Sequence, residues 1–396
     1  MIKRELTYDD ISLFSRQIST VKSRFDDKIF VGRKIKFGEK IIDTGIFMSA
    51  PMYDVTGVEM QIKLLNEGQI PIIHRFMKPD EQIDSLKEVL ERTNNNENYI
   101  YSYSIGINDY KEKFKLLTNL LTKYKNLNIL ICIDTANGAS ELLLDVLNKI
   151  NEYKKYYTNN NIEILTGNVV TKEACEFLIK HGVKFIRCGI SSGSACSTSV
   201  VTGIYRPPVS MLLEINEWRE KNNVEFYIVA DGGIRNTDDM LKAIACGADY
   251  IMSGRLFAGY DESNSDIIYN YENYFYNDNE LFEKVYDTNG SFAMNIPINK
   301  RKTTKYKKYR GMASMEMAEL NNKVNNLDKQ ILPEGVTDYV EYRGDRLSED
   351  LKRYLNSIRS SMSYANAYDL LEYEMNIDIV EITDNSNNLR KPLNRK

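Results

Sequence analysis

The stretch FYIVADGGIRNTDDMLKAIACGADYIMSG, residues 226–254, decides the fold. Its first part, Phe226–Asp231, and its last part, Tyr250–Gly254, are short apolar runs without the polar alternation of a half-solvated strand. Between them, Asp238–Cys246 is amphipathic at helical spacing. A buried strand, a helix and a second buried strand in this order predict a parallel βαβ unit.

Six further apolar runs of the same kind precede this unit. They are Phe47–Ala50, Ile70–Arg75, Tyr101–Gly106, Ile129–Asp134, Glu163–Asn168 and Phe185–Ile190, and amphipathic segments such as Glu59–Glu67, Lys111–Tyr124, Ser140–Tyr153 and Thr171–His181 lie between them. Because eight such units close a barrel, the sequence predicts an α/β protein with a (β/α)8 TIM barrel. An open Rossmann-type sheet is the competing architecture, but no Gly-x-Gly-x-x-Gly follows the first strand.

Length, charge and residue usage restrict the function. The 396 residues suffice for a single barrel domain over 1–396, and the net charge of −4 disfavours sequence-independent nucleic-acid binding. The chain has no secretory N-terminal pattern and no apolar run of about 18 residues, so we expect a cytoplasmic protein without a membrane span. The 5 cysteines lack metal-ligand spacing and only 2 histidines are present, which argues against a structural zinc site or a disulfide framework.

Three segments lie outside the regular βα pattern. Residues 261–308 are rich in Asn, Tyr and Lys and are interpreted as a long, partly ordered insertion after strand eight. Residues 312–334 are interpreted as a mobile flap near the barrel mouth, where such segments often carry function. Residues 384–396 are expected to form a disordered tail.

The active face of a barrel lies at the C-terminal ends of its strands. This rule selects Asp134, Asn168, the loop from Gly189 to Cys196, Asp231–Gly233 and Gly254. In the loop, Cys196 stands among small and hydroxyl-bearing residues that let a substrate approach closely. Cys196 can therefore be a nucleophile if its thiolate is stabilised, or a small buried hydrophobe.

Glycines after strands seven and eight indicate a phosphate site. Asp231-Gly-Gly233 and Ser253-Gly254 fall where barrels commonly hold a phosphate on backbone amides, and Ser194 adds a hydroxyl. Tight βα turns are the structural alternative. Asp231 could accept hydrogen bonds from ribose hydroxyls or cap the following helix.

Taken in order, the motifs resemble those of the IMP dehydrogenase/GMP reductase family. The resemblance rests on Leu6–Ile11, Ser49–Gly57, Ile72–Phe76, Ile133–Gly138, Gly167–Thr171, Gly193–Thr198, Ala230–Arg235, Tyr309–Met312, Pro333–Val336 and Arg359–Tyr364. It covers nearly the whole chain except 261–308 and the extreme tail. The short separation of strands two and three leaves no room for regulatory CBS domains.

The resemblance implies roles for particular residues. Cys196 would attack carbon 2 of a purine nucleotide, and Thr198 and Glu334 would handle protons beside it. The mononucleotide would be held at its 5′-phosphate by Ser194, Gly233, Gly254 and Tyr309, at its ribose by Asp231 and at its purine edge by the backbone of Met312 and Ala313.

The resemblance also implies a dinucleotide, a cation and an assembly. Asp134 would lie near the nicotinamide ribose. Ser360 and Tyr364 match positions that help bind the dinucleotide across a subunit boundary, which implies a homotetramer. A potassium ion would be bound by the backbone of Ser191, Gly193 and Cys196, but Ser191 replaces the usual glycine and puts this ion in question.

Two reactions of the family share a covalent bond between the cysteine and purine carbon 2. The dehydrogenase transfers hydride from IMP to NAD and hydrolyses the intermediate with an Arg-Tyr pair on its flap, whereas the reductase releases ammonia from GMP and accepts hydride from NADPH. Here Asn321-Asn322 stands at the position of that pair. Asparagine cannot replace an arginine as base or cation, so the sequence favours an NADPH-dependent GMP reductase.

Other features keep alternatives open. Leu332–Val336 is closer to the dehydrogenases, so IMP dehydrogenase is the second hypothesis. Arg255 replaces a small residue beside the phosphate and could either clamp a further phosphate or be an exposed arginine at a helix start. Ser191, Arg255 and the insertion are also compatible with a purine-nucleotide-binding protein without turnover, or with a deoxy or modified guanine nucleotide as substrate.

Overall fold

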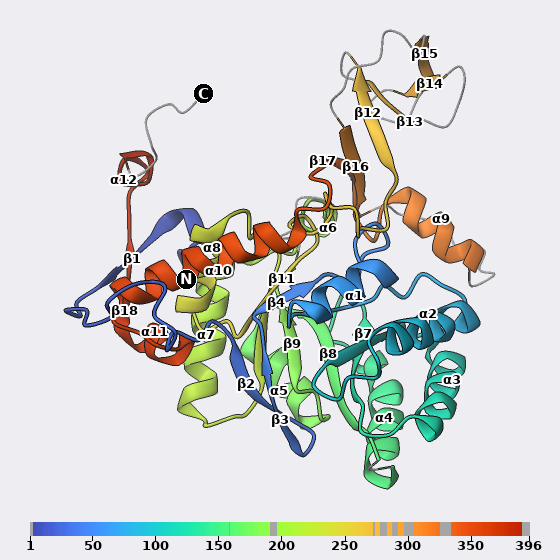
Figure 1. Cartoon of the computed structure of the whole chain (residues 1–396), viewed down its shortest axis with the longest axis horizontal. Coiled ribbons are helices and arrows are strands. Elements are labelled where there is room, and N and C mark those ends of the chain that lie inside the picture. Colours follow the sequence, from blue (N-terminus) through green and yellow to red (C-terminus); the bar gives the residue numbers. More distant parts are fainter. Residues whose placement is uncertain are drawn as a thin grey trace.

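The computed structural model describes residues 3–157, 159–190, 196–271, 274–277, 283–286, 292–296, 305–324 and 334–389. Within these ranges, the structure describes all side chains except those that fall in 270–304, at 321 and in 323–333. Figure 1 shows a barrel surrounded by helices, with a β-sheet extension standing away from one end.

Eight parallel strands form the barrel and confirm the predicted TIM-barrel class. They are β4 (Phe47–Ser49), β5 (Ile70–Pro71), β6 (Ile100–Ile105), β7 (Asn128–Asp134), β8 (Asn161–Val169), β9 (Phe185–Cys188), β10 (Tyr227–Asp231) and β11 (Tyr250–Ser253). Their order is β5-β4-β11-β10-β9-β8-β7-β6. Nearly every residue of these strands is buried, which explains why they read as continuous apolar runs.

Side chains close the barrel between β5 and β6, the two ends of this sheet. The backbone N–H of Ile73 donates to Ser102 Oγ at 2.8 Å, and the hydroxyl of Ser104 donates to the carbonyl of Ile73. The buried ammonium of Lys113 donates to the carbonyl of Arg75 at 2.5 Å. These polar side chains form hydrogen bonds with backbone groups that would otherwise pair in a β-ladder between β5 and β6.

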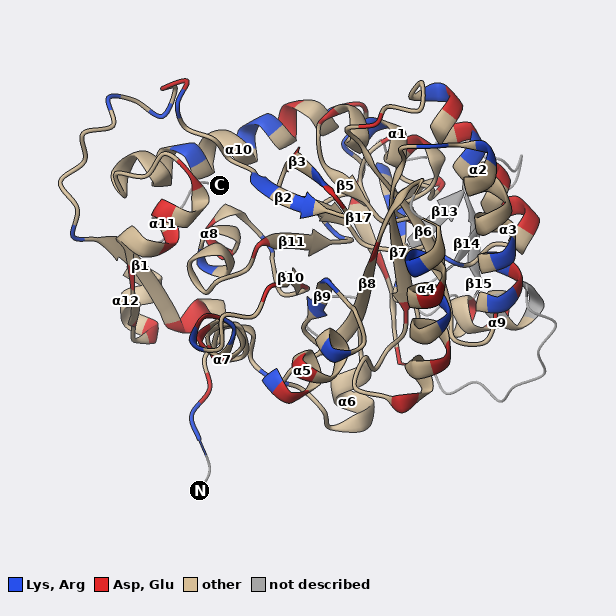
Figure 2. Cartoon of the chain, turned by 90° about the horizontal axis from the view of Figure 1, so that it is seen from below, with Lys and Arg blue, Asp and Glu red and all other residues tan. Residues whose placement is uncertain are grey.

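Amphipathic helices cover the outside of the barrel. They include α1 (Val58–Asn66), α2 (Pro79–Arg92), α3 (Tyr110–Lys123), α4 (Leu144–Tyr156), α5 (Lys172–Lys180), α7 (Pro208–Lys221) and α8 (Thr237–Ala245). Capping fixes where some of them begin, because Thr171 accepts a hydrogen bond from Ala174 N. Figure 2 shows acidic and basic residues interspersed along the outer helices. Within the described part of the chain, every helix is too short or too polar to cross a bilayer.

The two ends of the chain pack together beside the barrel. Strand β1 (Ile11–Ser15) pairs antiparallel with β18 (Ile377–Glu381). The other elements of this region are the hairpin β2 (Arg33–Phe37) and β3 (Lys40–Thr44), and helices α10 (Leu347–Tyr364) and α11 (Leu370–Asn376).

The segment expected as a disordered tail, 384–396, begins with helix α12 (Asp384–Leu389). Thr383 initiates this helix, because its hydroxyl oxygen accepts a hydrogen bond from Ser386 N at 3.3 Å. Asn387 is buried, which ties the helix to the rest of the chain. Residues 390–396 lie outside the described residues.

The segment 261–308 contributes strands to an antiparallel sheet of six. Its strands from this segment are β12 (Ile267–Tyr271), β13 (Tyr274–Asn277), β14 (Glu283–Tyr286), β15 (Phe292–Ile296) and β16 (Lys305–Arg310), and β17 (Thr337–Glu341) follows the flap. The order in the sheet is β15-β14-β13-β12-β16-β17. The sequence analysis predicted no strands in 261–308, because this segment is rich in Asn, Tyr and Lys and has few apolar positions at a regular spacing. The flap, 312–334, contains helix α9 (Met315–Val324), and residues 325–333 lie outside the described part.

Candidate active site

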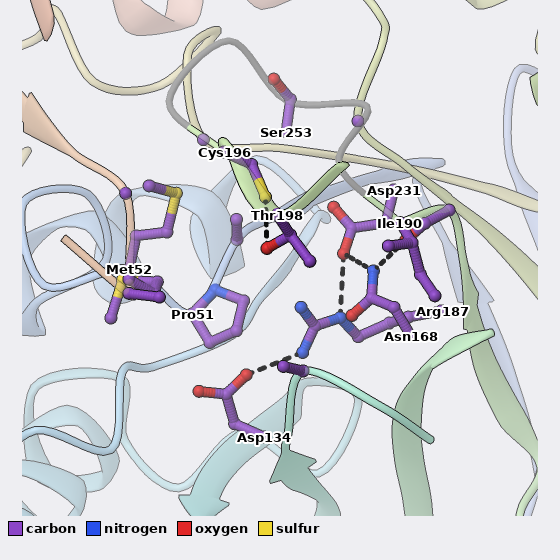
Figure 3. A pocket seen from close by; sticks show the side chains of 18 of the residues that line it. Pro51, Met52, Asp134, Asn168, Arg187, Ile190, Cys196, Thr198, Asp231 and Ser253 are labelled. Atoms are coloured by element: carbon purple, nitrogen blue, oxygen red, sulfur yellow. Dashed lines mark hydrogen bonds and ion pairs between the residues drawn. The ribbon is translucent and has the colours of Figure 1, made fainter. Parts of the chain in front are cut away.

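A pocket of about 490 Å³ opens at the C-terminal ends of the barrel strands. It gathers predicted residues from segments far apart in the sequence, namely Asp134, Cys196, Thr198, Asp231, Gly233, Gly254, Arg255, Tyr309, Met312, Ala313 and Glu334. Figure 3 shows Cys196 and Thr198 on one side of the pocket and Asp134, Arg187 and Asp231 on another. The volume is within the range of about 300–1,000 Å³ that is usual for small-molecule sites.

Cys196 is the only exposed cysteine of the five. It lies just before α6 (Thr198–Thr202), and its thiol donates to Thr198 Oγ1 at 3.3 Å. Burial raises the pKa of the thiols of Cys132 and Cys246 to about 12, so these two stay protonated. Cys196 is therefore the thiol that a substrate in the pocket can contact. The alternative hypothesis, that Cys196 is a small buried hydrophobic residue, is wrong.

Backbone hydrogen bonds join the Cys196 loop to both ends of the flap. Ser197 N donates to the carbonyl of Glu334 at 2.9 Å, and Glu334 N donates to the carbonyl of Ala313 at 2.8 Å. Residues Cys196 and Gly335 form an isolated antiparallel bridge. Cys196 and Glu334 are thus held in one local structure although they are remote in sequence.

The glycines of the predicted phosphate site bring backbone close to the pocket. Gly232 and Gly233 have φ values of 91° and 76°, a region that favours glycine. A Cβ atom on Gly254 would lie 2.4 Å from Met52 Sδ and 2.8 Å from Tyr309 Oη. Burial raises the pKa of Tyr309 well above its usual range, so its hydroxyl stays protonated and can donate to an anion.

A network of charges around the buried Arg187 forms the opposite side of the pocket. Arg187 donates to Asp134 Oδ1 at 2.9 Å through NH1 and to Asp231 Oδ2 at 3.0 Å through Nε. Arg75 approaches Asp134 Oδ2 at 3.3 Å, and Asn168 donates to Asp231 Oδ2 at 2.8 Å. The two carboxylates fix the orientation of Arg187 and keep its pKa raised even though burial opposes its charge.

Sequence reasoning did not assign a role to Arg187 or Arg75. Arg187 lies inside the apolar run Phe185–Ile190, and only 8% of its surface is exposed. A charged residue in a buried strand requires partners of opposite charge. The arginine within this apolar run was therefore the sequence signal that could have predicted the ion pairs of Arg187.

Arg255 lines the pocket but forms an ion pair. Its NH1 atom lies 2.5 Å from Asp338 Oδ2 of β17, and both side chains are partly exposed. The pair places Asp338 beside the predicted phosphate site, a neighbour that the sequence analysis did not include.

Some predicted residues are not brought to the pocket. Ser360 and Tyr364 lie on α10 and do not line it, and Tyr364 is 78% exposed. Ser191, Gly193 and Ser194 lie outside the described residues. Among the residues that the structure does describe, no cluster of His, Cys, Asp and Glu could hold a metal ion.

The fold and the pocket define a TIM-barrel protein with an accessible cysteine at its mouth. The family model of the IMP dehydrogenase / GMP reductase domain matches residues 5–294 and 288–391, so the chain belongs to this family of oxidoreductases. Members of the family bind purine mononucleotides and use a nicotinamide nucleotide cofactor.

Relatives with both names are equally similar to this chain. The inosine-5′-monophosphate dehydrogenase of Borreliella burgdorferi is 29% identical over 97% of this chain and 95% of its own length. GMP reductase of Onchocerca volvulus is 29% identical over 97% of this chain and 92% of its own, and GMP reductase of Caenorhabditis elegans is 29% identical over 98% and 95%. Overall similarity therefore does not distinguish the two reactions.

Proposed function

We propose that the protein catalyses the NADPH-dependent reductive deamination of GMP to IMP and ammonia. The observation that carries this proposal is the composition of the flap: between Met312 and Glu334 the chain contains neither arginine nor tyrosine. A hydrolytic step needs a group that deprotonates water. The flap lacks the Arg-Tyr pair that would serve, and reductive release of ammonia needs no activated water.

Arg310, the arginine nearest to the flap in the sequence, is a poor substitute for the base that would deprotonate water. Its guanidinium contacts Asp54 through Nε at 2.8 Å and through NH2 at 2.5 Å, and its NH1 donates to Glu316 at 3.0 Å. Although burial opposes the charge, these carboxylates raise the pKa of Arg310. A base must lose its proton, and this environment stabilises the protonated form.

The geometry of Cys196 suits attack on purine carbon 2. The Cys196 sulfur would bond to carbon 2 of GMP while the bond from carbon 2 to the amino nitrogen breaks, and the thiol proton would leave with ammonia. Thr198, 3.3 Å from the sulfur, and the carboxylate of Glu334 are the groups at hand to pass that proton. NADPH, when bound, supplies the hydride for carbon 2. A proton then returns to the sulfur as its bond to carbon 2 breaks, which leaves IMP and the free thiol.

The rest of the mononucleotide would contact other residues that line the pocket. The backbone at Gly233 and Gly254 and the protonated hydroxyl of Tyr309 would hold the phosphate. Asp231, already oriented by Arg187 and Asn168, would accept from a ribose hydroxyl. The backbone of Met312 and Ala313 would contact the purine edge.

The cofactor would occupy the side of the pocket at Asp134. Arg187 and Arg75 engage the two oxygens of this carboxylate, which fixes it for a ribose hydroxyl. Ser360 and the exposed Tyr364 would reach the dinucleotide of a neighbouring subunit in a homotetramer. Potassium at the Cys196 loop and a cytoplasmic location remain predictions.

IMP dehydrogenase is the second candidate, because the Borreliella burgdorferi relative with that name covers 97% of this chain. Chromatographic identification of products separates the two. We expect GMP and NADPH to yield IMP and ammonia, and IMP and NAD to yield no xanthylate. Xanthylate formation that depends on Cys196 would overturn the proposal, and nucleotide binding without any turnover would identify a binding protein.

A further inference from the structure

A second groove lies on the outside of the barrel between α3 and α4, and it shares no lining residue with the pocket at the barrel mouth. Its volume is about 580 Å³, which is also within the range of about 300–1,000 Å³ for small-molecule sites. Figure 1 shows the two helices next to each other in the outer layer of the barrel.

The α4 side of this groove is aromatic. Tyr153, Tyr156 and Tyr157 recur at the spacing of one helix face and line the groove. The rings of Tyr153 and Tyr157 stack with centroids 4.4 Å apart and planes 13° from parallel. Tyr156 and Tyr157 are 69% and 53% exposed, so flat aromatic surface faces the solvent.

The α3 side of the groove carries basic and polar groups beside the aromatic rings of Tyr110 and Phe114. Lys111 and Lys115 are one turn apart, and Thr118, Asn119 and Thr122 continue the same face of the helix. Lys149 of α4 adds a third ammonium group, 3.1 Å from Glu152.

The charges of the groove differ from those of the chain. Three lysines and a single glutamate line it, although the whole chain has a net charge of −4. The local excess of positive charge favours an anionic ligand.

We propose that the α3–α4 groove binds a nucleoside triphosphate, with its base stacked on the tyrosines of α4 and its phosphates at the lysines. Aromatic rings stack on any nucleobase, and lysine ammonium groups attract phosphate. Aromatic rings and lysine ammonium groups that line one groove match a ligand with one planar and one anionic part. The groove is a binding site distinct from the one at which the barrel reaction is proposed.

The test is calorimetric titration of the full-length protein with ATP while GMP saturates the pocket at the barrel mouth. We expect one ATP per chain. Tyr156→Ala should weaken ATP binding about tenfold, the effect of losing one base–aromatic stack, whereas Tyr156→Phe should keep it. Lys111→Glu/Lys115→Glu should weaken it at least about tenfold. Lys123→Glu, on the same helix outside the groove, should leave it unchanged.

Three results would overturn the proposal. Binding that GMP abolishes would place ATP at the barrel mouth. Inorganic triphosphate binding as tightly as ATP would show that the tyrosines contribute nothing. Absence of ATP binding, together with self-association that Tyr156→Ala removes, would show that a second copy of the chain covers the groove.

Discussion

Arg187 donates through Nε to Oδ2 of Asp231 at 3.0 Å, and the same guanidinium reaches Asp134, so a single buried cation holds two carboxylates of the pocket. We expect Arg187→Met to lower the free energy of unfolding by about 3 kcal/mol, because it leaves two carboxylates without their buried partner. It should also lower kcat/KM at least about a hundredfold, since both carboxylates would lose their orientation. Urea unfolding and steady-state kinetics measure the two effects. Unchanged stability and activity would contradict the proposed role of the network.

Cys196 is predicted to be essential for turnover but not for nucleotide binding. Cys196→Ser should lower kcat by at least about a thousandfold, because a serine hydroxyl is a far weaker nucleophile at neutral pH, while the affinity for GMP changes little. Cys246→Ala is the matched control, since Cys246 is buried on the outer side of the barrel and does not line the pocket. Activity retained in the serine variant would exclude covalent catalysis by Cys196.

The close packing around Gly254 predicts the effect of one added methyl group. In Gly254→Ala the new Cβ would lie 2.4 Å from Met52 Sδ and 2.8 Å from Tyr309 Oη, so these side chains must shift and the proposed phosphate site must change with them. We expect the KM for the mononucleotide to rise about tenfold or more. The same close contact should also lower the free energy of unfolding. If the tyrosine hydroxyl causes this loss of stability, the loss should be smaller when Gly254→Ala is introduced into Tyr309→Phe. Equal losses in both backgrounds would rule out the tyrosine contact as the cause.

The ion pair of Asp54 with Arg310 is predicted to position the start of the flap. Asp54 is 1% exposed and accepts from both the backbone and the guanidinium of Arg310, two residues before Met312. Asp54→Asn should raise the KM of the mononucleotide and lower stability by about 3 kcal/mol, because Arg310 loses its buried carboxylate partner and keeps only the more exposed Glu316. Glu59→Gln, an exposed carboxylate paired with Arg92, is the control and should change neither value. A normal KM in the Asp54 variant would separate this ion pair from substrate binding.

His74 gives the fold a defined pH dependence. Burial, together with Lys113, lowers the pKa of His74 to about 3. The unfolded chain therefore binds a proton at this residue below a pH of about 6.5 whereas the folded chain does not, so stability is full above that pH and falls as the pH decreases toward about 3. The loss from His74 between about pH 7 and about pH 5 should be roughly 2 kcal/mol.

His74→Asn tests this pH dependence. Asparagine offers an acceptor for the Phe76 N–H, which His74 Nδ1 accepts at 3.2 Å, but it does not titrate. Urea unfolding at both pH values should show a smaller loss of stability in the variant. Equal losses in the two proteins would assign the pH dependence to other groups.

The barrel could be predicted from the sequence because its strands are buried on both faces. A parallel strand inside a shell of helices must be apolar along its length, and runs such as Ile129–Asp134 show this directly. The strands of the 261–308 segment were missed for the opposite reason. Their Tyr and Ile residues favour strands but are mixed with Asn and Lys, and their pairing, such as Ile268 with Tyr306, depends on contacts remote in sequence.

Site residues could be predicted where a motif marks the end of a strand. They could not be predicted where their place in the pocket depends on ion pairs between residues remote in sequence. Cys196, Asp231 and Gly254 follow strands and could be located from their positions alone. The contacts of Arg187 with Asp134 and of Arg255 with Asp338 join residues that no local pattern connects. Ser360 and Tyr364 come from the resemblance alone, and their proposed role requires a second subunit.

The central claim is the direction of the reaction, and the absorbance of reduced nicotinamide tests it most directly. Purified protein would be mixed first with GMP and NADPH and then with IMP and NAD, both in the presence of potassium. The account predicts a fall in absorbance that requires GMP and Cys196, with release of ammonia. A rise in absorbance that requires IMP and NAD, with no change for GMP and NADPH, would contradict it and identify a dehydrogenase whose hydrolytic base is not the usual Arg-Tyr pair.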